Sequence, residues 1–422
     1  MRYLAVLRNR DFALLWIGAT LSLLGDGLTF VALVWLVLDR AGGAADVGAL
    51  VFWYTGPVVV GGLLAGLVLD RFDRQRALIA DNLVRGAAIA SIPVAAALGI
   101  LTNGQILFVA GIYGLLYMVS LAGIPSLIPS LVADRDLETA NALETVSFGI
   151  GGIAGPAIAG VLIGAVGAAN VLAVDAVSYL AFVGCLAFVR VPPSSGTEGR
   201  DVRHGAGLGP AFRFLLRQPT LLAITLMFMS FNLGEGILFV LLPVLARDVL
   251  AVGASGYGAL AASFTAGSLV GALAVGAVRW RWPIGRSIAA AQLATGLALL
   301  GLALRPELAG AVVVLALAGL LAAPLTIWAQ SLRMRLIPDE IRGRTFALLR
   351  TLMQSTPPLG GLVGGLLLSA GLLDPAAIAI GLLVAVPGVV GLVLPALGGA
   401  ATARPAVDRA SPGGSPSSVE PA

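Results

Sequence analysis

The sequence predicts an all-α integral membrane protein of twelve transmembrane helices, arranged as two pseudo-symmetric six-helix bundles. Three observations lead to this fold class: the composition, the number of long apolar stretches, and a phrase that occurs twice. Hydrophobic residues make up 58% of the 422 residues and only 11% are charged, whereas about 25% are charged in soluble domains. Apolar stretches of about 20 residues cross a bilayer as helices, because open sheets leave backbone groups unsatisfied in lipid.

Twelve stretches meet this criterion, and the arginines orient them. The chain has no lysine, and 21 of its 26 basic residues fall in segments that lie inside if both termini are cytoplasmic. The outer segments hold Arg40, Arg247 and Arg305, an asymmetry typical of multi-pass proteins. We therefore expect a bacterial cytoplasmic (inner) membrane protein with both termini in the cytoplasm, and no nucleic-acid partner. The expected spans are 12–38, 46–69, 77–100, 105–131, 142–166, 170–190, 219–246, 255–278, 287–304, 308–331, 346–370 and 375–397.

An internal repeat supports two halves. "LGDGLTFVALVWLVLD" from Leu24 returns 209 residues later as "LGEGILFVLLPVLARD" from Leu233, and similar segments begin at Gly48 and Gly258. Offsets that drift by a few residues while order is kept indicate duplicated halves. A Pro-, Gly- and Ser-rich segment separates them, with a short amphipathic helix expected near 211–217. The expected parts are an N-terminal six-helix bundle (1–190), a cytoplasmic linker (191–218), a C-terminal six-helix bundle (219–397) and a disordered cytoplasmic tail (398–422).

Each copy of the repeated phrase places an acid at mid-span. Asp26 lies midway along the first span and Glu235 midway along the seventh, where a charge costs at least about 2.5–3.5 kcal/mol. Such acids should face a water-filled cavity or a partner; alternatively, each bonds a backbone carbonyl or a structural arginine, and the flanking glycines mark helix breaks. Asp81 and Arg85 are four residues apart in the third span, which predicts an intramembrane ion pair on one helix face.

Two motifs carry a family resemblance. "GLVLDRFDRQR" after the second span resembles the loop 2–3 signature of the major facilitator superfamily, G-x-x-x-D-R-x-G-R-R/K, with Asp73 where the general pattern has Gly. This Asp variant resembles the macrolide-efflux and enterobactin (siderophore) exporter subgroup of drug:H+ antiporters. "GGIAGPAIAG" in the fifth span resembles the antiporter motif of exporters, with Ala159 in place of one glycine. The matching residues are Gly66, Asp70, Arg71 and Arg74, with Arg76 just beyond, and Gly151, Gly155, Pro156 and Gly160.

The resemblance implies a major facilitator fold that rocks two halves around a mid-membrane site. In such proteins Asp70 would face the start of the eleventh span near Thr345, and the loop arginines would bridge to Asp134 or Asp136. Together these contacts would form a cytoplasmic latch of the outward-open state. The glycines of the fifth span would permit close helix packing. Asp26 and Glu235 would line the central cavity, where either could couple proton uptake to export or neutralise a cationic substrate.

The function this predicts is secondary active export of a lipophilic small molecule (a drug, antibiotic or siderophore-like natural product) by proton antiport with alternating access. We expect no enzyme activity, no cofactor and no metal, a monomer, and partners limited to the small-molecule substrate, protons and the lipid bilayer. A proton-coupled importer or symporter on the same fold is the alternative. A polytopic membrane enzyme fits poorly, since the chain has no H-E-x-x-H or G-x-S-x-G motif and its single histidine, His204, lies in the linker.

Overall fold

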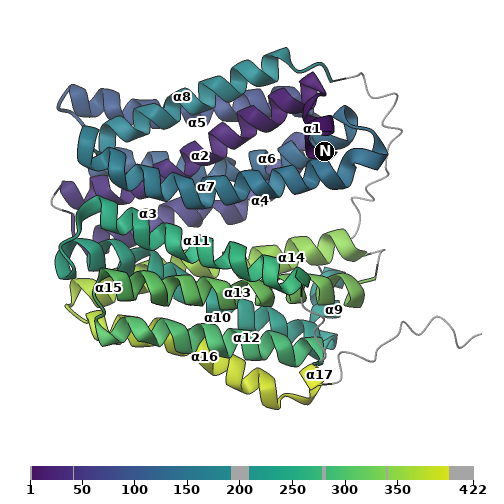
Figure 1. Ribbon diagram of the computed structural model, residues 1–422, viewed down its shortest axis with the longest axis vertical. Helices are drawn as coiled ribbons and strands as arrows, with labels where there is room; N and C mark the ends of the chain where they lie inside the picture. Colours follow the sequence, from purple (N-terminus) through teal and green to yellow (C-terminus); the bar gives the residue numbers. More distant parts are fainter. Residues whose placement is uncertain (1, 41, 192–208, 278–281, 339–340, 399–422) are drawn as a thin grey trace, which may run out of the picture.

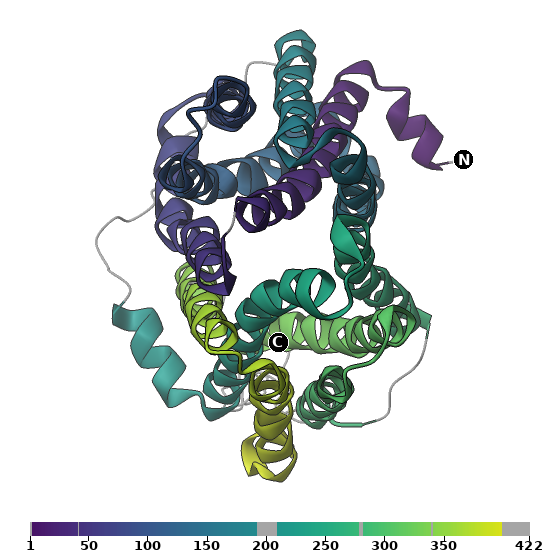
Figure 2. The same ribbon diagram turned by 90° about the vertical axis from the view of Figure 1, so that its left-hand side faces the viewer.

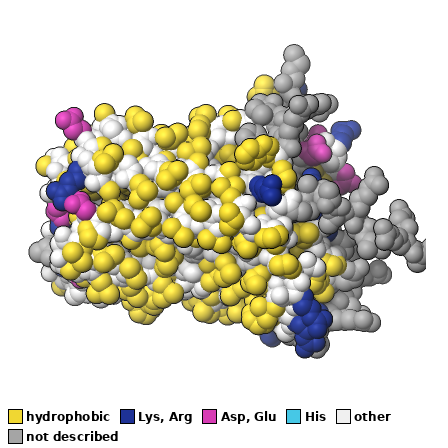
Figure 3. Space-filling model, turned by 90° about the horizontal axis from the view of Figure 1, so that it is seen from below, with side chains coloured by type: hydrophobic (Ala, Val, Ile, Leu, Met, Phe, Trp, Pro, Cys, Tyr) yellow, Lys and Arg dark blue, Asp and Glu magenta, His cyan; other side chains and the backbone are white. Residues whose placement is uncertain are grey.

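The computed structural model describes residues 2–40, 42–191, 209–277, 282–338 and 341–398. The N-terminal half lies above the C-terminal half in Figure 1, with the long helices running across the view. Viewed along these helices, the halves form two groups around the centre (Figure 2). Hydrophobic side chains cover the flank seen in Figure 3, and charged ones gather towards the two ends. This surface fits a protein embedded in a bilayer.

The N-terminal half begins with a short helix, and polar caps start several of the following ones. The Asn9 side chain accepts from the amides of Asp11 and Phe12, and Asp73 and Thr102 cap the next long helices similarly, which satisfies otherwise unpaired backbone donors. The helices are α1 (Arg2–Leu7), α2 (Arg10–Asp39), α3 (Ala44–Thr55), α4 (Pro57–Arg71), α5 (Arg74–Ala97), α6 (Asn103–Leu131), η1 (Asp134–Asp136), α7 (Leu137–Val166) and α8 (Ala168–Phe188).

A short helix, α9, lies at the position expected for the linker helix, and the long helices of the C-terminal half follow it. His204 and most of the linker and tail lie outside the described residues. The helices are α9 (Gly209–Arg217), α10 (Pro219–Val244), η2 (Leu245–Val249), α11 (Gly253–Ala277), α12 (Ile284–Leu300), η3 (Gly301–Leu304), α13 (Leu308–Leu336), α14 (Arg342–Gln354), α15 (Thr356–Ser369), α16 (Leu373–Val393) and α17 (Pro395–Gly398).

Among the described residues, eleven helical segments are long and apolar enough to span a membrane. The predicted eleventh span, 346–370, differs from the expectation because it forms two consecutive helices, α14 and α15, of 13 and 14 residues. Pro357 and Pro358 stand in the first turn of α15, where a missing N–H does no harm at a helix start but would interrupt a continuous helix.

Glycines hold the two halves together at one end. A Cβ added to Gly48 of α3 would lie 2.6 Å from the Gly361 oxygen of α15, and one added to Gly160 of α7 would lie 2.6 Å from the Ala254 oxygen of α11. Small residues let transmembrane helices approach this closely, and packing at such contacts drives their association. The seams α3–α15 and α7–α11 therefore join the halves by direct backbone contact.

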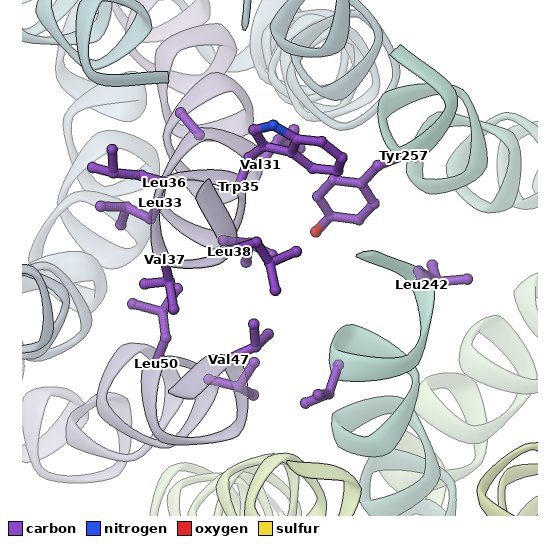
Figure 4. Packing of buried hydrophobic residues seen from close by; sticks show 14 of the residues in the cluster. Val31, Leu33, Trp35, Leu36, Val37, Leu38, Val47, Leu50, Leu242 and Tyr257 are labelled. Atoms are coloured by element: carbon purple, nitrogen blue, oxygen red, sulfur yellow. The ribbon is translucent and has the colours of Figure 1, made fainter. Parts of the chain in front are cut away.

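The joined end also has a continuous apolar core. Trp35 of α2 stacks on Tyr257 of α11 with ring centroids 6.4 Å apart, and Val47 and Leu242 belong to the same cluster (Figure 4). The Arg247 guanidinium donates to the Leu38 oxygen at 3.0 Å. We refer to this end as the outer end and to the opposite one as the cytoplasmic end, after the orientation expected from the arginine distribution, which stays a prediction. The structure is therefore sealed at its outer end.

The outer seam generates a stability prediction. Gly160→Ala should destabilise the folded protein by about 1–3 kcal/mol, because the added methyl overpacks the seam. Gly164→Ala, one turn along the same helix, meets nothing within 4 Å and should stabilise by up to about 1 kcal/mol through helix propensity. Thermal unfolding of the two variants in one detergent checks this. Equal unfolding temperatures would contradict the close contact.

Candidate functional site: a cavity between the halves

A cavity of about 520 Å³ lies between the halves on the cytoplasmic side of the outer seal. Asp26 of α2 and Glu235 of α10 are the charged residues among its described lining. Both acids therefore lie at one cavity, and their role in coupling or cargo binding stays a prediction. Nine aromatic side chains form much of the remaining wall: Phe30, Tyr54, Tyr113, Tyr117, Phe148, Phe231, Phe239, Tyr257 and Phe264.

Glycines beside each acid determine where its helix lies. Helices α2 and α10 run unbroken through these positions, so the glycines do not mark helix breaks. A Cβ on Gly27 would lie 3.0 Å from the Gly155 Cα of α7, and one on Gly236 would lie 2.9 Å from the Gly360 Cα of α15. The duplicated sequence segment thus provides glycines for close helix packing as well as an acid.

Asp26 is held by two partners from neighbouring helices. The Tyr179 hydroxyl of α8 donates to Asp26 Oδ1 at 2.5 Å, and Arg85 Nη1 of α5 lies 3.5 Å from the same oxygen. The Asp26 side chain keeps 11% of its surface exposed, whereas that of Arg85 is fully buried. Asp26 therefore connects the cavity to a buried polar network.

The expected Asp81–Arg85 ion pair is the centre of this network. Arg85 Nη2 lies 2.7 Å from Asp81 Oδ2, and the Ser120 hydroxyl of α6 donates to the same oxygen at 2.6 Å. The guanidinium also lies over the Tyr179 ring, 4.8 Å from its centroid, a favourable cation–π position. One buried cation thus serves both Asp81 and Asp26.

Glu235 lies in a different environment from Asp26. Among the described residues it forms no hydrogen bond or ion pair, and its side chain is partly exposed to the cavity. An uncompensated carboxylate beside aromatic walls attracts protons and cations, because water no longer screens its charge. The two duplicated acids therefore have different environments.

A second, smaller void adjoins Asp26. It measures about 30 Å³ and is lined by Trp16, Asp26, Ser120 and Glu144 among others. This is room for about one water molecule beside several polar groups. Because Glu144 lies near the cytoplasmic end of α7, the void leads from Asp26 towards that end.

The residues expected to form the cytoplasmic gating motif do not make the expected latch contacts among the described residues. A Cβ on Gly66 would meet nothing within 4 Å, and Asp70, Arg71 and Arg76 are exposed. Arg74 donates to the Ser126 oxygen at 2.9 Å. Among the described residues, none of these arginines pairs with Asp134 or Asp136, and the buried Thr345 hydroxyl has no hydrogen-bond partner.

The antiporter motif lies at two helix contacts. Gly151 and Gly155 pack against α2 near Leu23 and Gly27, while Gly160 packs against α11 in the other half. Pro156 stands inside α7, and its oxygen lies against Gly258 of α11. The motif thus joins the Asp26 helix to the outer seam.

Sequence reasoning did not find Asp175 and Tyr179 as members of the network. Both belong to α8, which carries no recognised motif. Asp175 is fully buried; it accepts a hydrogen bond from Thr29 of α2 and another from Ser178 at 2.8 Å. The sequence feature that could have indicated them is their spacing: an aspartate and a tyrosine four residues apart in an apolar span lie on one helix face.

Comparison with known proteins now identifies the family. A protein-family profile described as "Transmembrane secretion effector" matches residues 2–409. The chain belongs to this family. It is an efflux transporter of the major facilitator superfamily rather than an enzyme.

The chain is also similar to individual transporters at low sequence identity. The multidrug efflux pump Tap of Mycolicibacterium fortuitum is 28% identical over 396 residues, 92% of this chain and 95% of the relative. The enterobactin exporter EntS of Salmonella typhimurium is 24% identical and covers 79% and 80%. Solved structures of the nucleoside transporter NupG (TM-score 0.71, 14% identity, 90% and 98% covered) and a POT family transporter (0.72, 11%, 91% and 96%) show the same fold.

The buried network generates a second prediction. Arg85→Met should destabilise the protein by about 3–5 kcal/mol, because it leaves Asp81 buried without a counter-charge. Adding Asp81→Asn in the same chain should restore much of the loss, since the unpaired charge is then removed. Thermal unfolding of the single and double variants in detergent measures both steps. A double variant no more stable than Arg85→Met would contradict the pairing.

Proposed function

We propose that this transporter exports a lipophilic small molecule from the bacterial cytoplasm by proton antiport with alternating access. The observation that carries the proposal is the aromatic cavity between the halves, closed at the outer end and bearing two acids. The similarity to a multidrug efflux pump and an enterobactin exporter supports export rather than import. We further propose that it acts as a monomer in the cytoplasmic membrane, with both termini in the cytoplasm.

The cavity wall favours a cargo with aromatic or apolar surface and a basic group. Its described lining has nine aromatic rings, two acids and no arginine. Aromatic faces attract cations and pack against flat apolar groups. Glu235, which has no counter-ion among the described residues, is the acid best suited to meet a positive group on the cargo.

The proton would act at Asp26. Its carboxylate touches both the cavity and the Arg85 network, so a proton bound there changes the charge at the cavity wall while Arg85 stays paired with Asp81. Cargo from the cytoplasm and a proton from outside would then occupy the site in alternate states. Each binds the conformation that exposes the site to its own side, which is the requirement for exchange.

In the opposite, outward-open state, we propose that the cytoplasmic motif forms its latch. Asp70 at the end of α4 would meet the start of α14, a helix of the other half that lies beside α4 in the present structure. A carboxylate is favoured at a helix N-terminus by the partial positive charge there. The latch would close the cytoplasmic end while the glycine seams open at the outer end.

Glu235→Gln and Asp26→Asn separate cargo binding from proton coupling. In a pump-deficient bacterium, Asp26→Asn should abolish protonophore-sensitive export of lipophilic dyes, while Glu235→Gln should weaken export of cationic dyes more than of neutral ones. Dye efflux is measured with and without a protonophore, at matched membrane expression. Full export by both variants would exclude these acids from the mechanism, and accumulation of dye in energised cells would favour the importer.

The latch is tested by charge removal. Asp70→Asn should shift the population towards the inward-open state by up to about fivefold, because a helix N-terminal charge contributes about 1 kcal/mol. Spin labels at Phe72 and Gly343 report the distance across the cytoplasmic ends. Glu138→Gln, an exposed acid at the same end of α7, is the control and should leave the distribution unchanged. The same shift in both variants would contradict a specific latch.

A further inference from the structure

Asp175 is a buried acid that has no role in the proposed antiport. Its side chain is fully buried on α8, seven residues from the outer end of that helix. The carboxylate lies against the backbone of Gly25, and a Cβ added there would overlap Asp175 Oδ1. Gly25 immediately precedes Asp26 in α2, and Asp175 is not among the described residues that line the cavity.

The contacts of Asp175 are neutral hydroxyls. Thr29 donates to Oδ2, and Ser178 donates to Oδ1 at 2.8 Å. Among the described residues no arginine lies within 4 Å of Asp175. A hydroxyl can accept as well as donate, so a proton on Oδ2 reverses the Thr29 hydrogen bond without moving a heavy atom. The site accommodates both the charged and the neutral acid.

Among the described residues around Asp175, the acidic groups outnumber the basic ones. Helix α2 contributes Asp26, and α5 contributes Asp81 and Arg85. The tyrosines near this cluster, Tyr179 on α8, Tyr54 on α3 and Tyr113 and Tyr117 on α6, are neutral in their ordinary form. The acids of α7, Glu138 and Glu144, lie towards its cytoplasmic end.

Three carboxyls therefore lie in a cluster in which the one guanidinium among the described residues, that of Arg85, pairs with two of them. Arg85 forms ion pairs with Asp81 and Asp26, and among the described residues it forms none with Asp175. Surplus negative charge inside a membrane protein is costly, and buried groups avoid that cost by binding protons. Of the three, Asp175 has the fewest cationic contacts and the greatest burial.

We propose that Asp175 is a proton-binding carboxyl of the transport cycle, whose proton balances the charge of the network of Asp26, Asp81 and Arg85. This inference rests on the proposed proton antiport for its place in the cycle. The step is a simple protonation: the carboxylate takes one proton, becomes neutral, and returns it when the network gains positive charge or opens to water. Asp175 is thus a positioning and charge-balancing residue that does not contact the cargo.

The test is infrared spectroscopy of the full-length protein in liposomes, titrated between roughly pH 5 and pH 8. Wild type should show the carbonyl stretch of a protonated carboxylic acid that changes with pH. Asp175→Asn should lose one component of it, and Asp26→Asn should move the pH range over which that component changes. Ser178→Ala keeps the acid and should keep the component. A spectrum unchanged by Asp175→Asn, or a component that does not respond to pH, would overturn the inference.

Two further measurements complete the test. If Asp175→Asn fails to fold, Thr29→Val, which removes a hydroxyl but no charge, should shift the frequency of the same component; an unshifted band overturns the proposal. In the same liposomes, ethidium flux driven by a pH gradient tests the antiport itself. Wild-type flux that ignores the gradient contradicts the antiport, whereas the carbonyl signal still decides whether Asp175 binds a proton.

Discussion

Close backbone contact at glycines is the constraint on which this structure depends. In lipid, burial of apolar surface gives helices little reason to associate, so packing at small residues takes that role. Here the glycine seams join α3 to α15 and α7 to α11 across the halves. They seal the outer end, and their closure leaves the cavity on the cytoplasmic side. The same kind of contact at Gly25 makes room for a buried carboxylate beside the helix that carries Asp26.

The duplication preserved this packing but not the chemistry. Gly27 meets Gly155 in the first half as Gly236 meets Gly360 in the second. By contrast, Asp26 has Arg85 nearby on α5, whereas the corresponding helix of the second half, α12, buries Gln292, which donates to the Met227 oxygen at 3.0 Å. A neutral amide cannot compensate a carboxylate. The second acid therefore remains available to a ligand, while the first belongs to a charged network.

How much the sequence revealed depends on whether an interaction is local. The Asp81–Arg85 pair was predictable because both residues lie on one face of one helix. The contact of Asp26 with Tyr179 joins residues 153 positions apart, and no periodicity within a single span encodes that. The spans followed from apolar length, but the division of 346–370 depended on Pro357 and Pro358, which a length criterion does not weigh. The cytoplasmic latch stays a prediction, since this conformation leaves Asp70 exposed.

Asp26 belongs both to the cavity wall and to the buried polar network around Arg85, whereas Glu235 belongs to the cavity wall alone among the described residues. Asp26 alone among the three network carboxyls lines the main cavity, so any charge change in the network reaches the cargo through it. Arg85 is fixed by Asp81, Ser120 and the tyrosine ring and cannot follow a departing proton. Under the proposed antiport, the network would therefore change its charge by gaining or losing protons rather than by moving its cation. In this proposal, coupling would need no large side-chain motion, only alternate exposure of a polar cluster whose charge differs between the two states.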